Sequence, residues 1–260
     1  MTKTAQETLC FARFEDGDGP AWGRVDGRYV QKLKEAPWVS QEASGRPLKL
    51  GELKLLAPAR PGKVVCVGLN YRDHAEEMKE GLPREPKIFL KPPSSVADPD
   101  QAVLLPPQSA RVDHEAELAL VVGRRVRPGE KASGALFGYT CANDVTARDL
   151  QKIDGQWTRA KGFDTFCPLG PVLVAGLDAS NLAVYCRVNG KVRQKSNTAH
   201  MIFPPQKILE FVSSVMTLEP GDLILTGTPS GIAPVEEGDV MEVEIEGIGV
   251  LKNPVKARSR

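Results

Sequence analysis

The order of apolar and polar residues predicts a chain that is mainly β, with few helices. The segments KVVCVGLN, KIFLKPP and EAELALVVG are short apolar runs, which are typical of buried strands. Residues 204–222 differ, because the apolar positions 208, 209, 212, 215 and 216 share one face of an amphipathic helix. Residues 71–86 are polar, have helical spacing and contain the helix-ending residues Gly81, Pro83 and Pro86.

The first 60 residues predict a small β-rich domain of their own. Up to residue 33, short apolar runs alternate with Gly and Asp turn signals, which is typical of hairpins. Pro58 and Pro61 follow, so we place the boundary with the main domain, residues 61–260, near residue 60. In the last third, Gly-Asp turns at 221–222 and 238–239 each precede an apolar strand. The predicted fold class is therefore mainly β with a few helices (α+β).

Composition and charge exclude several classes of protein. The 34 basic and 33 acidic residues nearly cancel and form no basic stripe, so we expect no nucleic-acid partner. The N-terminus lacks the apolar run of a secretory signal, and no stretch approaches the roughly 18 apolar residues of a membrane span. The five cysteines are scattered without a CxxC pair, which favours reduced thiols and a cytoplasmic location.

The segment HEAELALVVG carries two carboxylates in an apolar strand. Because side chains alternate faces in a strand, Glu115 and Glu117 point the same way. A solvated face would explain this pair alone, but Asp144, where the run GYTCAND meets a turn, offers a third carboxylate. Three such oxygen ligands favour Mg²⁺, Mn²⁺ or Ca²⁺ over zinc. The sequence thus predicts a divalent-metal site.

Other polar residues are candidates for acid–base chemistry or substrate binding. His74 and Glu77 lie three apart on one helix face, as an acid–base pair or as a solvent-facing pair. Arg148 could bind a substrate carboxylate or form an ion pair with Asp149 or another acid. We also expect substrate contacts from three further side chains, which are Lys91, Gln151 and Thr228. Lys161 could likewise contact an anionic substrate. Walker, GxGxxG, GxSxG and HExxH motifs are absent.

Taken together, these motifs resemble the fumarylacetoacetate hydrolase (FAH) family. The resemblance runs from about residue 64 to 255, through GLNYRDHAEEM, IFLKPPSSV, HEAELALVVG, NDVTARD, WTRAKGFDTFCPLGP, RVNGKVRQ, MIF, LEPGDLILTGTPSG and GDVMEVEIEGIG. It implies a β-sandwich roll and a homodimer. It also implies site roles: metal ligands Glu115, Glu117 and Asp144; a His74–Glu77 dyad on a mobile lid (residues 71–86); catalytic Lys161; substrate-binding Arg148; and the threonine of TGTP at Thr228.

The resemblance also implies an enzyme that uses Mg²⁺ or Mn²⁺ on a small 2-oxo or enol carboxylate. Asn70 stands where fumarylacetoacetate hydrolases themselves carry an aspartate, which points to family members with other chemistry. We expect an isomerase of 2-hydroxyhepta-2,4-diene-1,7-dioate, as in the catabolism of aromatic compounds. The alternatives are a C–C hydrolase or decarboxylase of the acylpyruvate hydrolase or oxaloacetate decarboxylase type, and a non-catalytic carboxylate-binding protein.

Overall fold

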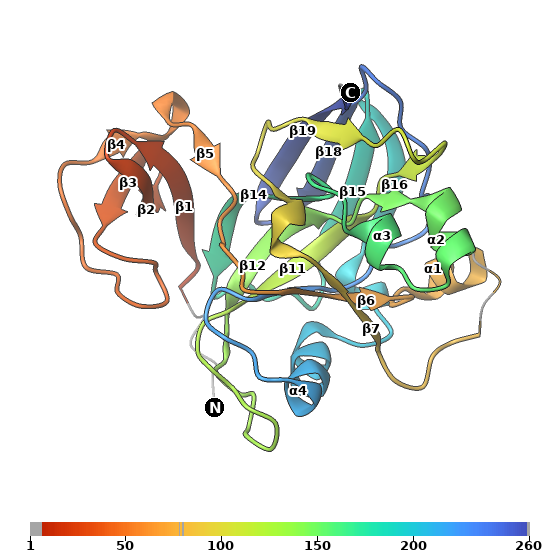
Figure 1. The fold of residues 1–260 in the computed structure, drawn as a ribbon. Helices are drawn as coiled ribbons and strands as arrows, with labels where there is room; N and C mark the ends of the chain where they lie inside the picture. The colour runs from red at the N-terminus through yellow and green to blue at the C-terminus, as the bar shows by residue number, and fades with distance from the viewer. Residues whose placement is uncertain (1–6, 78, 80, 259–260) are drawn as a thin grey trace.

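The computed structural model describes residues 7–77, 79 and 81–258, and within them strands outnumber helices (Figure 1). The described residues form one large sheet, a five-stranded sheet and four α-helices. This confirms the predicted fold class. No helix in the described ranges is long and apolar enough to cross a membrane.

The N-terminal residues form antiparallel hairpins, as the turn signals predicted. β1 (Leu9–Asp16), β2 (Gly19–Asp26) and β3 (Tyr29–Leu33) pair in sequence order. The short strands β4 (Leu48–Lys49) and β5 (Leu55–Leu56), with the 3₁₀ turn η1 (Leu50–Glu52) between them, complete this unit at the left of Figure 1. β1 also pairs with β14, so the hairpins continue the large sheet of the main body.

The main body is built on the rest of the large sheet. Its order is β14-β12-β11-β17-β6-β7, and the strands are β6 (Val64–Gly68), β7 (Lys87–Lys91), β11 (Ala116–Val122), β12 (Leu136–Asn143), β14 (Cys167–Ala175) and β17 (Leu223–Leu225). Every residue of β11 is buried. An uninterrupted apolar strand of this kind belongs at the centre of a sheet that is covered on both faces.

A second sheet packs against the first. Its order is β16-β15-β18-β19-β9, and the strands are β9 (Val103–Leu105), β15 (Ala183–Val188), β16 (Lys191–Asn197), β18 (Val240–Ile245) and β19 (Gly249–Ala257). Leu118 and Leu120 of β11 share one buried cluster with Val184, Val243 and Ile245 of this sheet. The core therefore lies between two sheets, as in a sandwich.

Short strands, 3₁₀ turns and helices complete the fold of the described residues. β8 (Val96–Ala97) pairs with β14, and β10 (Val112–Asp113) pairs with β13 (Thr146–Ala147). The 3₁₀ turns η2 (Pro93–Ser95) and η3 (Thr198–His200) precede β8 and follow β16. The helices are α1 (Arg72–Glu77), α2 (Arg148–Asp154), α3 (Thr158–Lys161) and α4 (Pro205–Val215).

The amphipathic helix predicted within residues 204–222 is α4. Its start at Pro205 suits a residue that has no N–H to donate in the first helical turn. Ile208, Leu209 and Val212 are buried against the core, which confirms most of the predicted apolar face. The prediction was wrong for Val215, which is 53% exposed, because the helix ends there and Met216 takes an extended backbone conformation.

Candidate functional site

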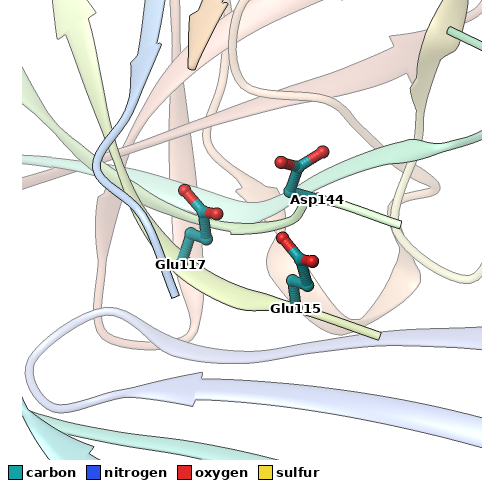
Figure 2. Close-up of side chains that lie close together, drawn as sticks. All are labelled: Glu115, Glu117 and Asp144. Atoms are coloured by element: carbon teal, nitrogen blue, oxygen red, sulfur yellow. The ribbon is translucent and has the colours of Figure 1, made fainter. Parts of the chain in front are cut away.

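Three buried carboxylates converge where β11 begins and β12 ends. Glu115 immediately precedes β11, Glu117 lies within it on the same face, and Asp144 immediately follows β12. The backbone N–H of Asp144 donates to the carbonyl of Glu115 at 2.9 Å, so the antiparallel register sets these two side by side. One oxygen from each carboxylate lies within 4.8 Å of the other two. Figure 2 shows the three side chains close together.

Buried cations neutralise two of these carboxylates. Lys161 Nζ donates to Glu115 at 2.8 Å and to Asp144 at 2.6 Å, and Lys91 Nζ donates to Asp144 at 2.6 Å. Arg148 also donates to Glu115. Burial alone would raise the pKa of Glu115, but Lys161 and Arg148 outweigh it and hold that pKa well below its usual value. Glu115 therefore carries a full negative charge.

Glu117 is the carboxylate whose charge is least compensated. Burial, and then the charges of Asp144 and Glu115, raise the pKa of Glu117 well above its usual value. The backbone N–H of Gly227 donates to it at 2.7 Å. A divalent cation would supply the positive charge that this oxygen cluster lacks, and hard oxygen ligands suit such an ion. The buried triad could therefore hold a metal ion.

The predicted dyad forms beside this cluster. His74 Nδ1 and Glu77 Oε2 lie 3.0 Å apart across one turn of α1, and His74 is 6% exposed. With Glu77 accepting the Nδ1–H, Nε2 is the ring nitrogen left to exchange a proton. His74 lines the same cavity as the three carboxylates. From the sequence, the pair could also have faced solvent. The structure instead shows a buried His74.

A cavity of about 190 Å³ joins the dyad to the triad. One wall is a face of α2, where Arg148, Gln151 and Lys152 follow one another at helical spacing. An aromatic wall is made by Phe89 and Trp157, whose rings meet edge to face at 5.1 Å. The remaining lining residues are Val67, Gly68, Leu69, His74, Glu115, Glu117, Asp144 and Thr228.

Arg148 lines the cavity but is already bonded within the protein. Its Nε donates to Asp113 at 2.9 Å, while its terminal nitrogens donate to Glu115 and, at 2.6 Å, to Gln151. Asp149, the partner considered from the sequence, instead accepts from Ser109 and a backbone N–H. Arg148 thereby positions Glu115 and occupies the amide oxygen of Gln151.

The other predicted substrate contacts occupy different positions. Lys91 is 1% exposed, and its Nζ contacts Asp144 and the carbonyl of Val145. Lys161 is 2% exposed and also lies behind the carboxylates; neither lysine is among the described residues that line the cavity. Thr228 does line it, but its hydroxyl donates to the carbonyl of Ala116 at 2.9 Å. Their roles towards substrate stay predictions.

Several residues of the site were not found by sequence reasoning. Gln194 of β16 is fully buried and bonds His114, the backbone N–H of Ala116 and Thr228. It was visible only as the last residue of the RVNGKVRQ motif. Phe89 and Trp157 were likewise visible only as members of the IFLKPPSSV and WTRAKGFDTFCPLGP motifs. Asp113 carried no local signal, because its role depends on contacts between distant segments.

Comparison with known proteins identifies the family of the chain. The family described as fumarylacetoacetate (FAA) hydrolase, C-terminal, matches residues 63–256, and the family described as Rv2993c-like, N-terminal, matches residues 11–58. The mitochondrial oxaloacetate tautomerase Fahd2a of Rattus norvegicus is 41% identical over 253 residues, which cover 91% of this chain and 81% of the rat protein.

Solved structures of similar sequence have the same fold over nearly the whole chain. The 2-hydroxyhepta-2,4-diene-1,7-dioate isomerase of Mycobacterium marinum is 42% identical, with a TM-score of 0.89 over 97% of this chain and all of its own. The 5-carboxymethyl-2-hydroxymuconate delta-isomerase of Mycobacterium smegmatis is also 42% identical, with a TM-score of 0.88 over 96% of this chain and all of its own. The chain therefore belongs to the fumarylacetoacetate hydrolase family.

Proposed function

We propose that this protein is a Mg²⁺- or Mn²⁺-dependent isomerase of a small 2-oxo or enol dicarboxylate. The observation that carries the proposal is one cavity that holds both a buried carboxylate triad and a histidine whose second ring nitrogen is free to exchange a proton. Such a cavity suits reactions in which a proton moves next to a carbonyl group. 2-Hydroxyhepta-2,4-diene-1,7-dioate is the first candidate substrate.

The residues divide the chemistry between them. A divalent cation on Glu115, Glu117 and Asp144 would supply positive charge where the negative charge of an enolate develops. His74 would take a proton at Nε2 and return it to a different atom of the substrate, which completes an isomerisation without any other reactant. Glu77 holds the ring in the tautomer that this transfer needs and stabilises the imidazolium that it produces.

The cavity wall formed by α2 favours a substrate that has a second carboxylate. Lys152 lies one helical turn beyond Arg148 and is exposed at the rim of the cavity. Among the described residues, the structure shows no acidic side chain in an ion pair with Lys152. Its ammonium group is thus available to a carboxylate at the far end of a substrate. The names of the similar isomerases and of the rat tautomerase all refer to substrates with at least two carboxylates.

Oxaloacetate tautomerisation is the second candidate, because the rat relative carries that name. It uses the same proton transfer on a shorter diacid. C–C hydrolysis or decarboxylation would instead require that His74 activate a water or that a C–C bond of the substrate lie against the cation. The product therefore distinguishes these reactions.

The test is an assay of the full chain, stripped of metal with a chelator and then supplied with Mg²⁺ or Mn²⁺. We expect metal-dependent conversion of 2-hydroxyhepta-2,4-diene-1,7-dioate or of enol-oxaloacetate, with a single isomer as the product by NMR. Two fragments or released CO₂ would identify a hydrolase or a decarboxylase. Absence of turnover with both diacids and both metals would contradict an enzymatic role on them and favour a carboxylate-binding protein.

We also infer a homodimer, in keeping with the resemblance set out above. The edge strand β7 leaves Leu90 48% exposed, and uncovered apolar edges favour association. Light scattering should give twice the 28.2 kDa of one chain.

A further inference from the structure

The loop after β17 contacts both halves of the candidate site. At its start, the N–H of Gly227 donates to the metal-site carboxylate Glu117. At its end, the hydroxyl of Ser230 donates to Asp73 at 2.9 Å, and the N–H of Gly231 donates to Glu77 at 3.1 Å. One short loop thus joins the triad to the two acidic side chains that flank the dyad histidine on α1.

Asp73 and Glu77 each also form a hydrogen bond with His74 through their other carboxylate oxygen. Asp73 Oδ1 accepts the backbone N–H of His74 at 2.9 Å, and Glu77 Oε2 bonds the ring nitrogen Nδ1 at 3.0 Å. The backbone and the ring of His74 are therefore each connected to the loop through one carboxylate. Because a carboxylate can accept at both oxygens, neither contact interferes with the other.

Little of α1 itself is buried, although Tyr71, directly before it, lies in the core. The helix has six residues, of which only His74 and Ala75 are buried. Helices this short gain little from their own hydrogen bonds. The chain before α1 is held by Asn70, whose side-chain amide donates to Thr226 and Phe203. For the described residues of α1, the contacts with Ser230 and Gly231 are thus a major constraint on its orientation.

The loop itself is rigidly held. Thr226 and Thr228 donate their hydroxyls to carbonyls of β11, and Gln194 donates to Thr228 and to the carbonyl of Pro229. Gly227 has φ +92°, and a Cβ there would lie 2.8 Å from Asn70 Cβ, so the close approach of the loop to the chain before α1 requires glycine. The loop can therefore act as a fixed template for α1.

We propose that Ser230 is a positioning residue for His74. It does not line the cavity, yet through Asp73 it holds α1 in the orientation that turns the imidazole towards the triad. The proposal rests on the proposed function only where it assigns the proton transfer to His74. The docking of α1 on the loop is a structural claim that can be tested without any turnover.

The first readout is amide exchange over residues 72–77. Ser230→Ala should speed exchange there by about 5- to 10-fold, which corresponds to the loss of one hydrogen bond, while Ser230→Thr should retain slow exchange. Ser214→Ala is the matched control, because the Ser214 hydroxyl is exposed and bonds only within α4. Equal exchange in wild type and Ser230→Ala would overturn the proposal, whether or not the protein proves to be an isomerase.

The second readout separates positioning from binding. With a turned-over diacid, Ser230→Ala should lower kcat by about 5- to 10-fold and leave the affinity for oxalate plus Mg²⁺ unchanged, and Ser230→Thr should restore the rate. In an Asp73→Ala background, Ser230→Ala should have no further effect, because both act through one contact. Additive effects of the two substitutions, or an equal loss of oxalate affinity, would contradict a positioning role.

Discussion

Glu117 is the residue whose chemistry depends most on a bound cation. Lys161 and Lys91 contact Asp144, and Lys161 and Arg148 contact Glu115, whereas Glu117 accepts its hydrogen bond from a neutral backbone group. We predict that Glu117→Gln raises the melting temperature of the metal-free protein by roughly 2–4 °C, equivalent to about 1 kcal/mol. The same substitution should abolish the rise in melting temperature that Mg²⁺ or Mn²⁺ produces in the wild type.

The effect of Glu117→Gln should depend on pH in a defined direction. Burial and the neighbouring carboxylates raise the pKa of Glu117 in the folded state above the 4.5 of a free glutamate. At a pH between 4.5 and the raised pKa of the folded state, the folded protein keeps a proton that the unfolded chain releases. The stability of the wild type therefore falls as the pH rises from about 4.5. Thermal melts should show the advantage of the variant growing over that range. A constant or shrinking difference would contradict the assignment of a raised pKa.

Lys152 is predicted to select for a second carboxylate. Oxaloacetate and 2-oxobutyrate have the same number of carbon atoms, and only oxaloacetate carries the distal charge. Lys152→Ala should raise KM for oxaloacetate by about 2- to 5-fold, the usual effect of an exposed ion pair, without changing binding of 2-oxobutyrate. Lys256→Ala, which removes an exposed lysine from β19 outside the cavity, is the control. An equal change for both acids would show that Lys152 does not recognise the distal carboxylate.

At the scale of elements, α1 is predicted to change its protection with ligand. The surrounding polar segment, residues 71–86, is bounded by Gly and Pro, and few of the side chains of α1 are buried. Oxalate with Mg²⁺ should therefore slow amide exchange at residues 72–77, because a filled cavity favours the docked helix over transiently open states. Exchange that is equally slow before and after addition would show a rigid element.

The periodicity of the sequence predicted long elements better than short ones. The seven residues of β11 follow from an apolar run, and most of the eleven residues of α4 follow from apolar positions at helical spacing. α2 and α3 were not predicted, because they have seven and four residues and neither has a side-chain cap at its start. The consequence is functional, since α2 brings Gln151 and Lys152 into the cavity wall, where a turn had been expected after Asp144.

At the scale of the whole molecule, the two sheets bring distant segments to one cavity. Strand alternation alone placed Glu115 and Glu117 on one face, and the position of Asp144 at a strand end suggested the third ligand. The pairing of β11 with β12 then brings them together. Contacts such as His114–Gln194, 80 residues apart, depend on how the sheets stack and could not be read from local spacing.

We propose above all that His74 transfers a proton on a diacid beside the carboxylate triad. The most direct measurement is the rate of C3 hydrogen–deuterium exchange of oxaloacetate in D₂O with Mg²⁺, followed by NMR. His74→Ala should lower that rate by roughly 10²–10⁴-fold and leave oxalate binding unchanged. His200→Ala, which removes an exposed histidine bonded to Ser196, should exchange at the wild-type rate. A His74→Ala protein that exchanges oxaloacetate hydrogen as fast as the wild type would contradict proton transfer by His74.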